Sequence, residues 1–585
     1  MAAIIEMDGV SFSYGAEAEH ALDDVSLRVN EGDFVGIIGP SGAGKSTLAA
    51  CLSGAIPHHF TGELFGSTLI AGKDTCDVTL TDISRLVGSV AQDIDAQMVA
   101  SVVEDELLFG LENFGVPHDQ IEDRIARTLA TVGIADLRER EIATLSGGQK
   151  QKVAIAAILA LEPRVLVLDE PTAALDPVSS RVVFETLADV NRRLGVTVIV
   201  IEQKVALLSS FCSRVVVMDH GRIALSGTPH EVFGHSDRLC AIGVDSPRTA
   251  RISNSLVGDG LVAQAAPCLN VDEAHALIRS VLAGVPGVAQ AAADDPEPSP
   301  HIPTRPHAQG ADPILTFRQV GFTYPGGGAS VTDLDMTVYP GELVGIVGQN
   351  GAGKTTLTKL LNGLLKPTRG KVRVAGLDTR ETPVSTVAAH VATLFQNPDR
   401  QICKNTVLDE VAFGLELIGV DPAAARERAR RVIKRFGLPA GEAPFSLSRG
   451  QRQMVALAGV VVMEPDIVVL DEPTSGLDYR ECMTVMETVR DMADHGSAVI
   501  MVCHDMEVVS DFAERIVVMA DGRILGRGPA ADLFANTALM EAASVTPPQV
   551  IDLSVRLARD VSPAFAHITE VSDIVRTVKE LMGRA

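Results

Sequence analysis

One glycine-rich pattern occurs twice in this chain, and this repetition limits the possible folds more than any other feature of the sequence. Each copy fits G-x-x-x-x-G-K-[ST], follows a short apolar run and precedes a helix-like stretch. In that context the glycines let successive backbone N–H groups converge on phosphate oxygens, and the helix N-terminus attracts negative charge. The pattern therefore predicts two phosphate-binding loops: Gly39-Pro40-Ser41-Gly42-Ala43-Gly44-Lys45-Ser46 and Gly348-Gln349-Asn350-Gly351-Ala352-Gly353-Lys354-Thr355.

The same series of shorter motifs follows each loop. A glutamine comes first, then a serine-led stretch, then an apolar run that ends in Asp-Glu, and then Leu-Asp. Matching residues stay about 300 residues apart, which is too long for the unit of a solenoid and suits two copies of a whole domain. The first copy has Gln92, Leu145-Ser146-Gly147-Gly148-Gln149, Asp169-Glu170 and Leu175-Asp176; the second has Gln396, Leu447-Ser448-Arg449-Gly450-Gln451, Asp471-Glu472 and Leu477-Asp478.

Composition excludes several classes of protein. The chain has 585 residues, more than one hydrophobic core supports. Its formal net charge is −25 and no Lys/Arg-rich block is visible, so we expect no nucleic-acid partner. No apolar run reaches the ~18–20 residues of a membrane-spanning helix. Short runs such as 196–201 and 467–470 instead predict strands buried on both faces of a mainly parallel sheet. The N-terminus lacks the features of a signal peptide, and the eight scattered cysteines predict buried thiols in a reducing cytoplasm.

Together these motifs resemble the ATP-binding cassette of ABC transporters, over almost the whole chain apart from a linker. The resemblance implies an α/β fold with two P-loop NTPase, ABC-type nucleotide-binding domains in tandem, each with a helical signature subdomain and a small C-terminal tail. It also implies an ATPase that uses Mg²⁺. We expect the first domain at 1–235, its tail at 236–285, a Pro/Ala-rich linker at 286–312, the second domain at 313–535 and its tail at 536–585. An extended linker of this length reaches on the order of 80 Å, so the cassettes can pair within one chain.

The family resemblance also implies a role for each motif. Two cassettes sandwich two ATP molecules, each held between the P-loop of one copy and the signature of the other. Glu170 and Glu472 would polarise the attacking water, with Gln203 and His504 as the switch residues beside them. The residues expected near Mg²⁺ are Ser46, Gln92, Asp169, Thr355, Gln396 and Asp471.

The expected ATP-binding set extends beyond the two P-loops. Tyr14 and Tyr324 resemble the aromatic residue that stacks on adenine, although each suits an ordinary strand aromatic equally well. The remaining members are Thr47, Thr356, Ser146, Gly147, Gly148, Gln149, Ser448, Arg449, Gly450 and Gln451.

The two predicted sites are unequal. His504 is the switch histidine of the family, whereas the first copy has Gln203, which donates a hydrogen bond but cannot become cationic. Arg449 replaces the first glycine of the second signature, so both departures fall on the site that combines the first P-loop with the second signature. This pattern favours slow turnover at that site. The alternative is that Gln203 substitutes adequately and Arg449 points away, and the retained Glu170 supports that alternative.

The segment around Gln396 indicates one group within the ABC family. Phe395-Gln396-Asn397-Pro398-Asp399-Arg400-Gln401, with 409–416 after it, resembles energy-coupling factor (ECF) and cobalt-type importer ATPases, and the first copy keeps part of it. In that family the segment helps to form a groove for a coupling helix. Phe109 and Phe413 would line this groove, or they are ordinary core residues of a helix face. The resemblance implies a transmembrane coupling subunit, a small membrane protein that captures a vitamin or metal ion, and a place at the cytoplasmic face of the membrane.

Two other functions remain open. A soluble twin-cassette ATPase that acts on ribosomes would usually have a long, charged helical linker, which the proline-rich, acidic 286–312 segment disfavours. An exporter ATPase is disfavoured by the resemblance around Gln396, although less strongly.

Overall fold

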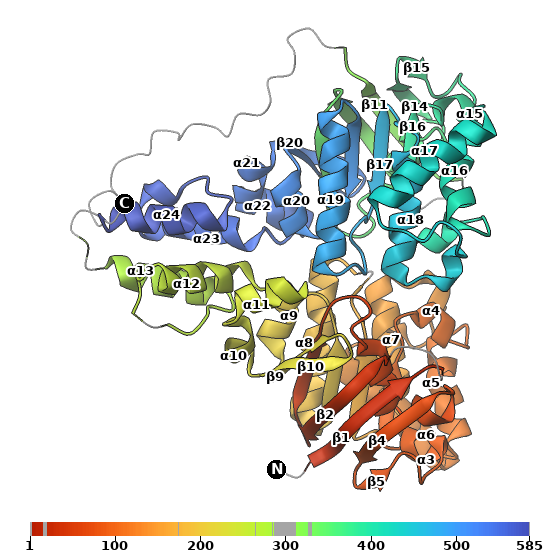
Figure 1. Ribbon diagram of the computed structural model, residues 1–585, viewed down its shortest axis with the longest axis vertical. Coiled ribbons are helices and arrows are strands. Elements are labelled where there is room, and N and C mark those ends of the chain that lie inside the picture. Colours follow the sequence, from red (N-terminus) through yellow and green to blue (C-terminus); the bar gives the residue numbers. More distant parts are fainter. Residues whose placement is uncertain are drawn as a thin grey trace. The chain divides into compact units, whose positions relative to one another are not determined.

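The computed structural model describes residues 3–15, 20–173, 175–263, 265–283, 285, 312–325 and 330–583. These residues form two compact units (Figure 1), one from residues 1–258 and 263–270 and the other from residues 259–262 and 271–585. The predicted linker lies outside the described residues except for Asp312.

A six-stranded sheet organises the first cassette. Its order is β10-β9-β3-β8-β7-β6, and all neighbours pair in parallel except β9 with β10. Every residue of β3 and β8 is buried, as the apolar runs predict for a sheet covered on both faces. The strands are β3 (Phe34–Ile38), β6 (Val87–Val90), β7 (Val165–Asp169), β8 (Thr197–Ile201), β9 (Arg214–Asp219) and β10 (Arg222–Gly227).

A second, antiparallel sheet packs on the same core, and the sequence motifs did not predict it. Its order is β2-β1-β4-β5, from β2 (Leu22–Asn30), β1 (Ala3–Ser13), β4 (Glu63–Ile70) and β5 (Lys73–Asp74). One face of β1 and β2 joins the buried cluster that also contains Val35 and Ile37 of β3 and Leu48 of α1. This sheet therefore closes the face of the core next to the P-loop.

The helices of the first cassette cover the six-stranded sheet and build the signature subdomain. α5, α6 and α7 pack together around the buried Leu107, Ile125 and Val153. The helices are α1 (Lys45–Leu52), α2 (Ala55–His58), α3 (Leu80–Ser84), α4 (Ile94–Gln97), α5 (Val103–Asn113), α6 (His118–Val132), α7 (Gly147–Leu159), α8 (Pro177–Leu194), α9 (Val205–Phe211), α10 (Pro229–Phe233), α11 (Ser236–Ile242) and α12 (Arg248–Gly258).

The second cassette repeats both sheets. Their orders are β16-β17-β18-β13-β19-β20 and β12-β11-β14-β15. The strands are β11 (Leu315–Thr323), β12 (Ser330–Val338), β13 (Leu343–Val347), β14 (Arg369–Val374), β15 (Leu377–Asp378), β16 (Val391–Leu394), β17 (Ile467–Asp471), β18 (Ala498–Val502), β19 (Arg515–Ala520) and β20 (Arg523–Pro529). The helices are α14 (Lys354–Leu361), α15 (Val384–Val387), α16 (Val407–Leu417), α17 (Pro422–Arg435), α18 (Arg449–Val461), α19 (Tyr479–Asp494), α20 (Met506–Phe512), α21 (Ala530–Ala535) and α22 (Thr537–Ala543).

The tails are helical, as their apolar spacing predicts. In the second unit α13 (Val271–Leu282) packs against α23 (Gln549–Asp560) and α24 (Val571–Leu581). Arg556 of α23 donates to Asp272 of α13 at 2.6 Å, and Ile278 is fully buried. The last helix of the first tail therefore belongs to the second unit.

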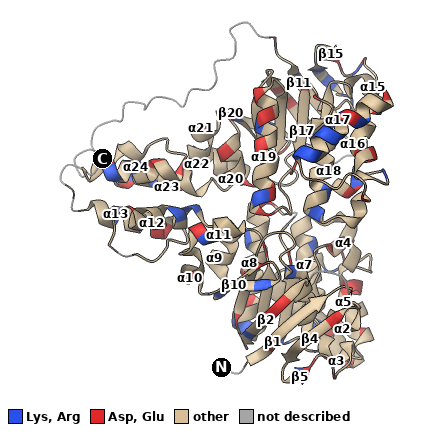
Figure 2. Ribbon diagram, viewed as in Figure 1, with Lys and Arg blue, Asp and Glu red and all other residues tan. Residues whose placement is uncertain are grey.

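Two expectations from composition need correction. All eight cysteines are thiols, but only Cys51, Cys212, Cys268 and Cys503 are buried. Cys76, Cys240 and Cys403 are exposed, because they lie in a turn, on the outer side of α11 and in the loop before α16. Moreover, a Lys/Arg-rich block does exist: Figure 2 shows it on α17, whose sequence is PAAARERARRVIKR. Among the described residues, no helix is long and apolar enough to cross a membrane.

Candidate active site

Both P-loops connect a buried strand to a helix, as predicted, and both hold their lysine inside the loop. Lys45 Nζ donates to the carbonyl oxygens of Gly39 and Pro40 at 2.7 and 2.8 Å. Lys354 Nζ makes the equivalent bonds in the second cassette. Gly44 has φ 93°, and a Cβ there would lie 2.3 Å from the carbonyl oxygen of Ala21, so only glycine fits this turn. The loops therefore present a lysine and a helix N-terminus at the same point, which suits a polyphosphate.

A half-buried aspartate ends the strand that lies two places from the P-loop strand in each sheet. Burial raises the pKa of Asp169, while a hydrogen bond from Ser46 and the charge of Lys45 oppose the shift. Burial likewise raises the pKa of Asp471, while the positive charges of Lys354 and Lys359 lower it. The hydroxyl of Ser46 and the carboxylate of Asp169 thus meet beside a lysine, and hard oxygen ligands of this kind are those that Mg²⁺ prefers. The residues fit the predicted metal.

Glu170 and Glu472 follow these aspartates in an unusual backbone conformation. Their φ angles are 47° and 51°, a region that few residues other than glycine adopt and that concentrates at functional sites. In the second cassette His504 holds the glutamate: its backbone N–H donates to Glu472 Oε2 at 3.0 Å, and its Nε2 lies 3.2 Å from Glu472 Oε1. The predicted pair of Glu472 and His504 is therefore assembled within one cassette.

The first cassette holds its glutamate with amides. Gln92 Nε2 donates to Glu170 Oε2 at 2.6 Å, and Gln203 Nε2 donates to Glu170 Oε1 at 3.5 Å. The structure thus places Gln92, expected near the metal, against Glu170. Both contacts come from neutral groups, whereas an imidazole can also carry a positive charge.

Both signature serines cap a helix. Ser146 and Ser448 accept hydrogen bonds from the backbone N–H groups of Gln149 and Gln451, whose side chains bond back to the serine N–H groups. These capping boxes begin α7 and α18, so each signature presents a helix N-terminus. Arg449 of the second signature lies over its own cassette: a Cβ added to Gly476 would be 3.1 Å from the guanidinium carbon.

The two tyrosines lie beside the P-loop helices. Tyr14 is 50% exposed, and its hydroxyl is 3.1 Å from Thr47 Oγ1. The hydroxyl of Tyr324 is 3.4 Å from Thr356 Oγ1. Each ring also makes an edge contact with a strand phenylalanine, Phe12 or Phe322. The exposure of Tyr14 leaves a ring face available to a base.

Sequence reasoning missed four buried or half-buried polar residues near the sites. Glu106 and Glu410 each accept two backbone N–H bonds from the segment that follows the predicted Q-loop. Glu202 and Lys204 flank Gln203 and bind the loop after Glu170. An acidic residue directly after a fully apolar strand was the available signal for Glu202.

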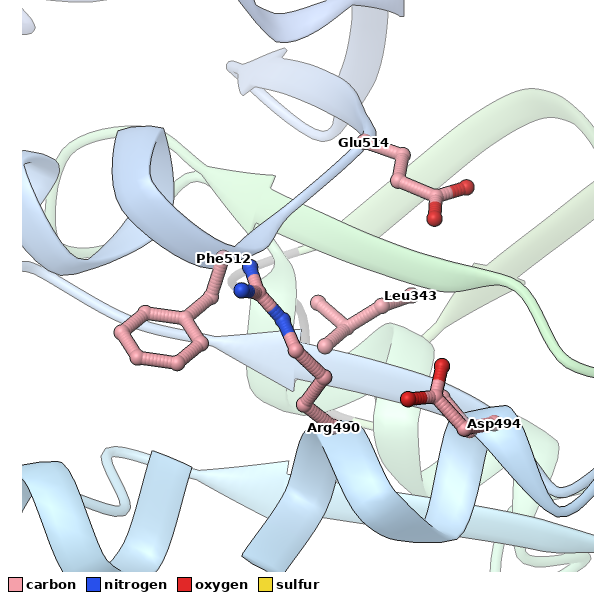
Figure 3. A pocket seen from close by; sticks show the side chains of 6 residues that line it. Leu343, Arg490, Asp494, Phe512 and Glu514 are labelled. Atoms are coloured by element: carbon pink, nitrogen blue, oxygen red, sulfur yellow. The ribbon is translucent and has the colours of Figure 1, made fainter. Parts of the chain in front are cut away.

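A small pocket of the second cassette lies apart from these residues. Figure 3 shows it between α19, α20 and β13, with Arg490 beside the ring of Phe512. None of the predicted ATP-site residues lines it.

Comparison with known proteins agrees with this arrangement. The profile of the ABC transporter family matches residues 22–173 and 331–475. A protein of Caldanaerobacter subterraneus subsp. tengcongensis, named "Putative ABC transporter ATP-binding protein", is 34% identical over 94% of this chain and 95% of its own length. The Bacillus subtilis "Putative HMP/thiamine import ATP-binding protein YkoD" is 32% identical over 93% of this chain and 95% of its own length. The chain therefore belongs to the ATP-binding proteins of ABC transporters, which are ATPases, and it carries two such α/β domains in tandem.

Proposed function

We propose that this protein is the ATP-hydrolysing subunit of an ECF-type importer for a vitamin or a metal ion. Two composite sites would form within the chain, each from the P-loop of one cassette and the signature of the other. Mg²⁺ would be bound through Ser46 and Asp169 in one site and Thr355 and Asp471 in the other. The domain boundaries expected from the sequence are part of the same proposal.

Large apolar side chains are exposed on the segments that contain or follow each predicted Q-loop, and this observation carries the proposal. Phe109 of α5 is 53% exposed and Phe395 is 41% exposed, so neither is a core residue. Leu417 and Ile418, which end α16 and follow it, are 70% and 44% exposed. Exposed apolar side chains concentrated in one stretch of the chain suit a docking site.

The backbone beneath this surface is held firmly. The half-buried Phe413 lies under the ammonium of Lys404, 3.8 Å from the ring centroid. Glu410 Oε2 accepts the N–H groups of Cys403 and Lys404 at 2.8 and 2.7 Å, and Glu106 does the same for Val99 and Ala100. Exposed apolar side chains on a backbone held in this way suit the docking of a helix from a partner.

The partners in this proposal are a transmembrane coupling subunit and a small substrate-capture membrane protein, with the chain at the cytoplasmic face of the membrane. The similarity to a protein whose name includes HMP/thiamine import supports uptake over export. Substrate choice would belong to the capture protein, because every site residue predicted from this sequence is assigned to ATP or Mg²⁺.

Affinity purification from detergent-solubilised membranes of the source organism tests the proposal. We expect a multi-span membrane protein to copurify, and we expect the double variant Phe109→Asp/Phe395→Asp to lose it while keeping ATP hydrolysis. Phe65→Asp is the matched control, because Phe65 is 58% exposed but lies on β4. Recovery of ribosomes without a membrane protein would favour the ribosome-associated alternative, and ATP-driven efflux by the recovered complex would favour an exporter.

A further inference from the structure

The switch loops of the two cassettes are built from different residues. Glu202-Gln203-Lys204 follows β8 in the first cassette, and Cys503-His504-Asp505 follows β18 in the second. The middle residue faces the catalytic glutamate in both. The flanking residues of the first cassette, Glu202 and Lys204, have no role in the proposed reaction and yet make a dense set of polar contacts.

Lys204 reaches the loop that begins at Glu170. Its Nζ donates to the carbonyl oxygens of Thr172 and Leu175 at 2.8 and 3.0 Å, and to Ser180 Oγ at 2.8 Å. These acceptors span the end of the loop and the first turn of α8. One ammonium group therefore ties the switch loop to both ends of the segment after Glu170.

Glu202 also joins the switch loop to the loop after Glu170. It is 1% exposed, and its carboxylate accepts from the Thr172 hydroxyl and from the backbone N–H groups of Gln203 and Lys204 at 2.9 and 3.3 Å. A carboxylate so deeply buried is stable only because several donors face it. Thr172 thus bonds to both flanking residues: its hydroxyl donates to Glu202, and its carbonyl oxygen accepts from Lys204.

The second cassette cannot form this bridge. Asp505 stands at the position of Lys204, and its carboxylate accepts from the N–H groups of Glu507 and Val508 to cap α20. An ionised carboxylate has no proton to donate to the carbonyls of Thr474 and Leu477. Cys503, at the position of Glu202, is buried, and its sulfur lies 3.8 Å from Thr474 Oγ1, a weak contact.

We propose that Lys204 and Glu202 are positioning residues of the first ATP site, which join its switch loop and the loop after Glu170 into one rigid unit. This unit keeps Gln203 and Glu170 at a fixed separation. The amide of Gln203 is a weaker switch group than the imidazole of His504. The second site has the stronger switch group, His504, on a loop without this bridge. The inference rests on the proposed roles of Glu170 and Gln203.

Hydrogen–deuterium exchange on the full chain tests the bridge without relying on activity or on a transport partner. In Lys204→Met we expect amide exchange in residues 172–180 to rise about tenfold, because three charge-assisted bonds are lost. Lys204→Arg keeps a charged donor and should show a smaller rise. Lys366→Met is the matched control, since Lys366 also bonds backbone carbonyls, those of Thr379 and Thr382, far along the chain from the switch loop. Unchanged exchange in Lys204→Met would overturn the bridge.

Single-turnover ATP hydrolysis in a Glu472→Gln background tests the positioning role. Adding Lys204→Met should slow the remaining hydrolysis about tenfold without changing ATP affinity, because a small displacement of the reacting groups affects the rate and not the binding. Faster amide exchange with an unchanged rate of ATP hydrolysis would overturn this role. A Glu472→Gln parent with no measurable hydrolysis would also overturn it. If Lys204→Met yields little folded protein, Ser180→Ala removes one acceptor and is measured in its place, with the same expected direction.

Discussion

At the scale of single residues, the two glutamates proposed to be catalytic share a backbone conformation and differ in the groups that hold them. Glu472 is next to an imidazole, and Glu170 is next to two amides. An imidazolium can stabilise the charge that develops on a transferred phosphoryl group, whereas a neutral amide only donates a hydrogen bond. The difference that the sequence suggested is thus present in the geometry of each cassette.

We predict unequal losses from matched substitutions of the two glutamates. Glu472→Gln should remove nearly all steady-state hydrolysis, leaving the slow turnover of the first site, while ATP stays bound. Glu170→Gln should cost much less, because each carboxylate acts on one γ-phosphate. Lys354→Ala should also remove most turnover, by deleting a phosphate contact and a charge. Steady-state rates of the purified variants, with ATP binding measured in parallel, decide this. Equal losses from the two Glu→Gln changes would mean two competent or obligatorily coupled sites, and the interpretation of Gln203 as an impairment would then be wrong.

At the scale of elements, the segment after each Q-loop takes its shape from one buried glutamate on the following helix. Glu410 is 9% exposed on α16 and binds two successive N–H groups seven and six residues earlier in the chain. The same arrangement recurs with Glu106 on α5. The proposed docking residues Phe109, Leu417 and Ile418 lie on or next to these same helices, so we expect their placement to depend on this carboxylate.

Glu410→Gln should destabilise the second cassette by about 1–3 kcal/mol, because a charged acceptor of two buried bonds becomes a neutral one. Urea denaturation measures this loss, and Glu416→Gln, at an exposed position of the same helix, is the control.

A second readout is chemical. Burial and the neighbouring Glu410 raise the pKa of the Cys403 thiol. Removing the carboxylate charge should lower that pKa, so alkylation of Cys403 near pH 8 should become faster while Cys76 reacts as before. An unchanged Cys403 rate would contradict the assigned contact.

At the scale of the whole molecule, the division into two units does not follow the sequence repeat. The first tail supplies α13 to the second unit, where Asp272 bonds Arg556 and where Ile278 is buried. The chain therefore contributes a helix of its first half to the packing of its second half.

Ile278→Asp should destabilise the second unit and spare the first. A charge placed at this fully buried position is expected to cost at least about 3 kcal/mol. Hydrogen exchange should accelerate in α23 and α24, with residues 22–173 unaffected. Ser280→Asp adds the same charge at an exposed position of α13 and should have no effect. Faster exchange confined to the first cassette would contradict the assignment of α13.

The sequence by itself determined the duplicated α/β fold, both P-loops and the position of every motif along the chain. It could do so because these features depend on local patterns: β3 and β13 coincide with the apolar runs, and α1 and α14 begin at the predicted lysines. Only the tertiary structure decided which polar groups meet. Lys204 bonds partners 24 to 32 residues earlier in the chain, and α13 packs on helices of the second tail. The exposure of Cys76 and the antiparallel sheet likewise depend on contacts between distant segments, and no local spacing encodes such contacts.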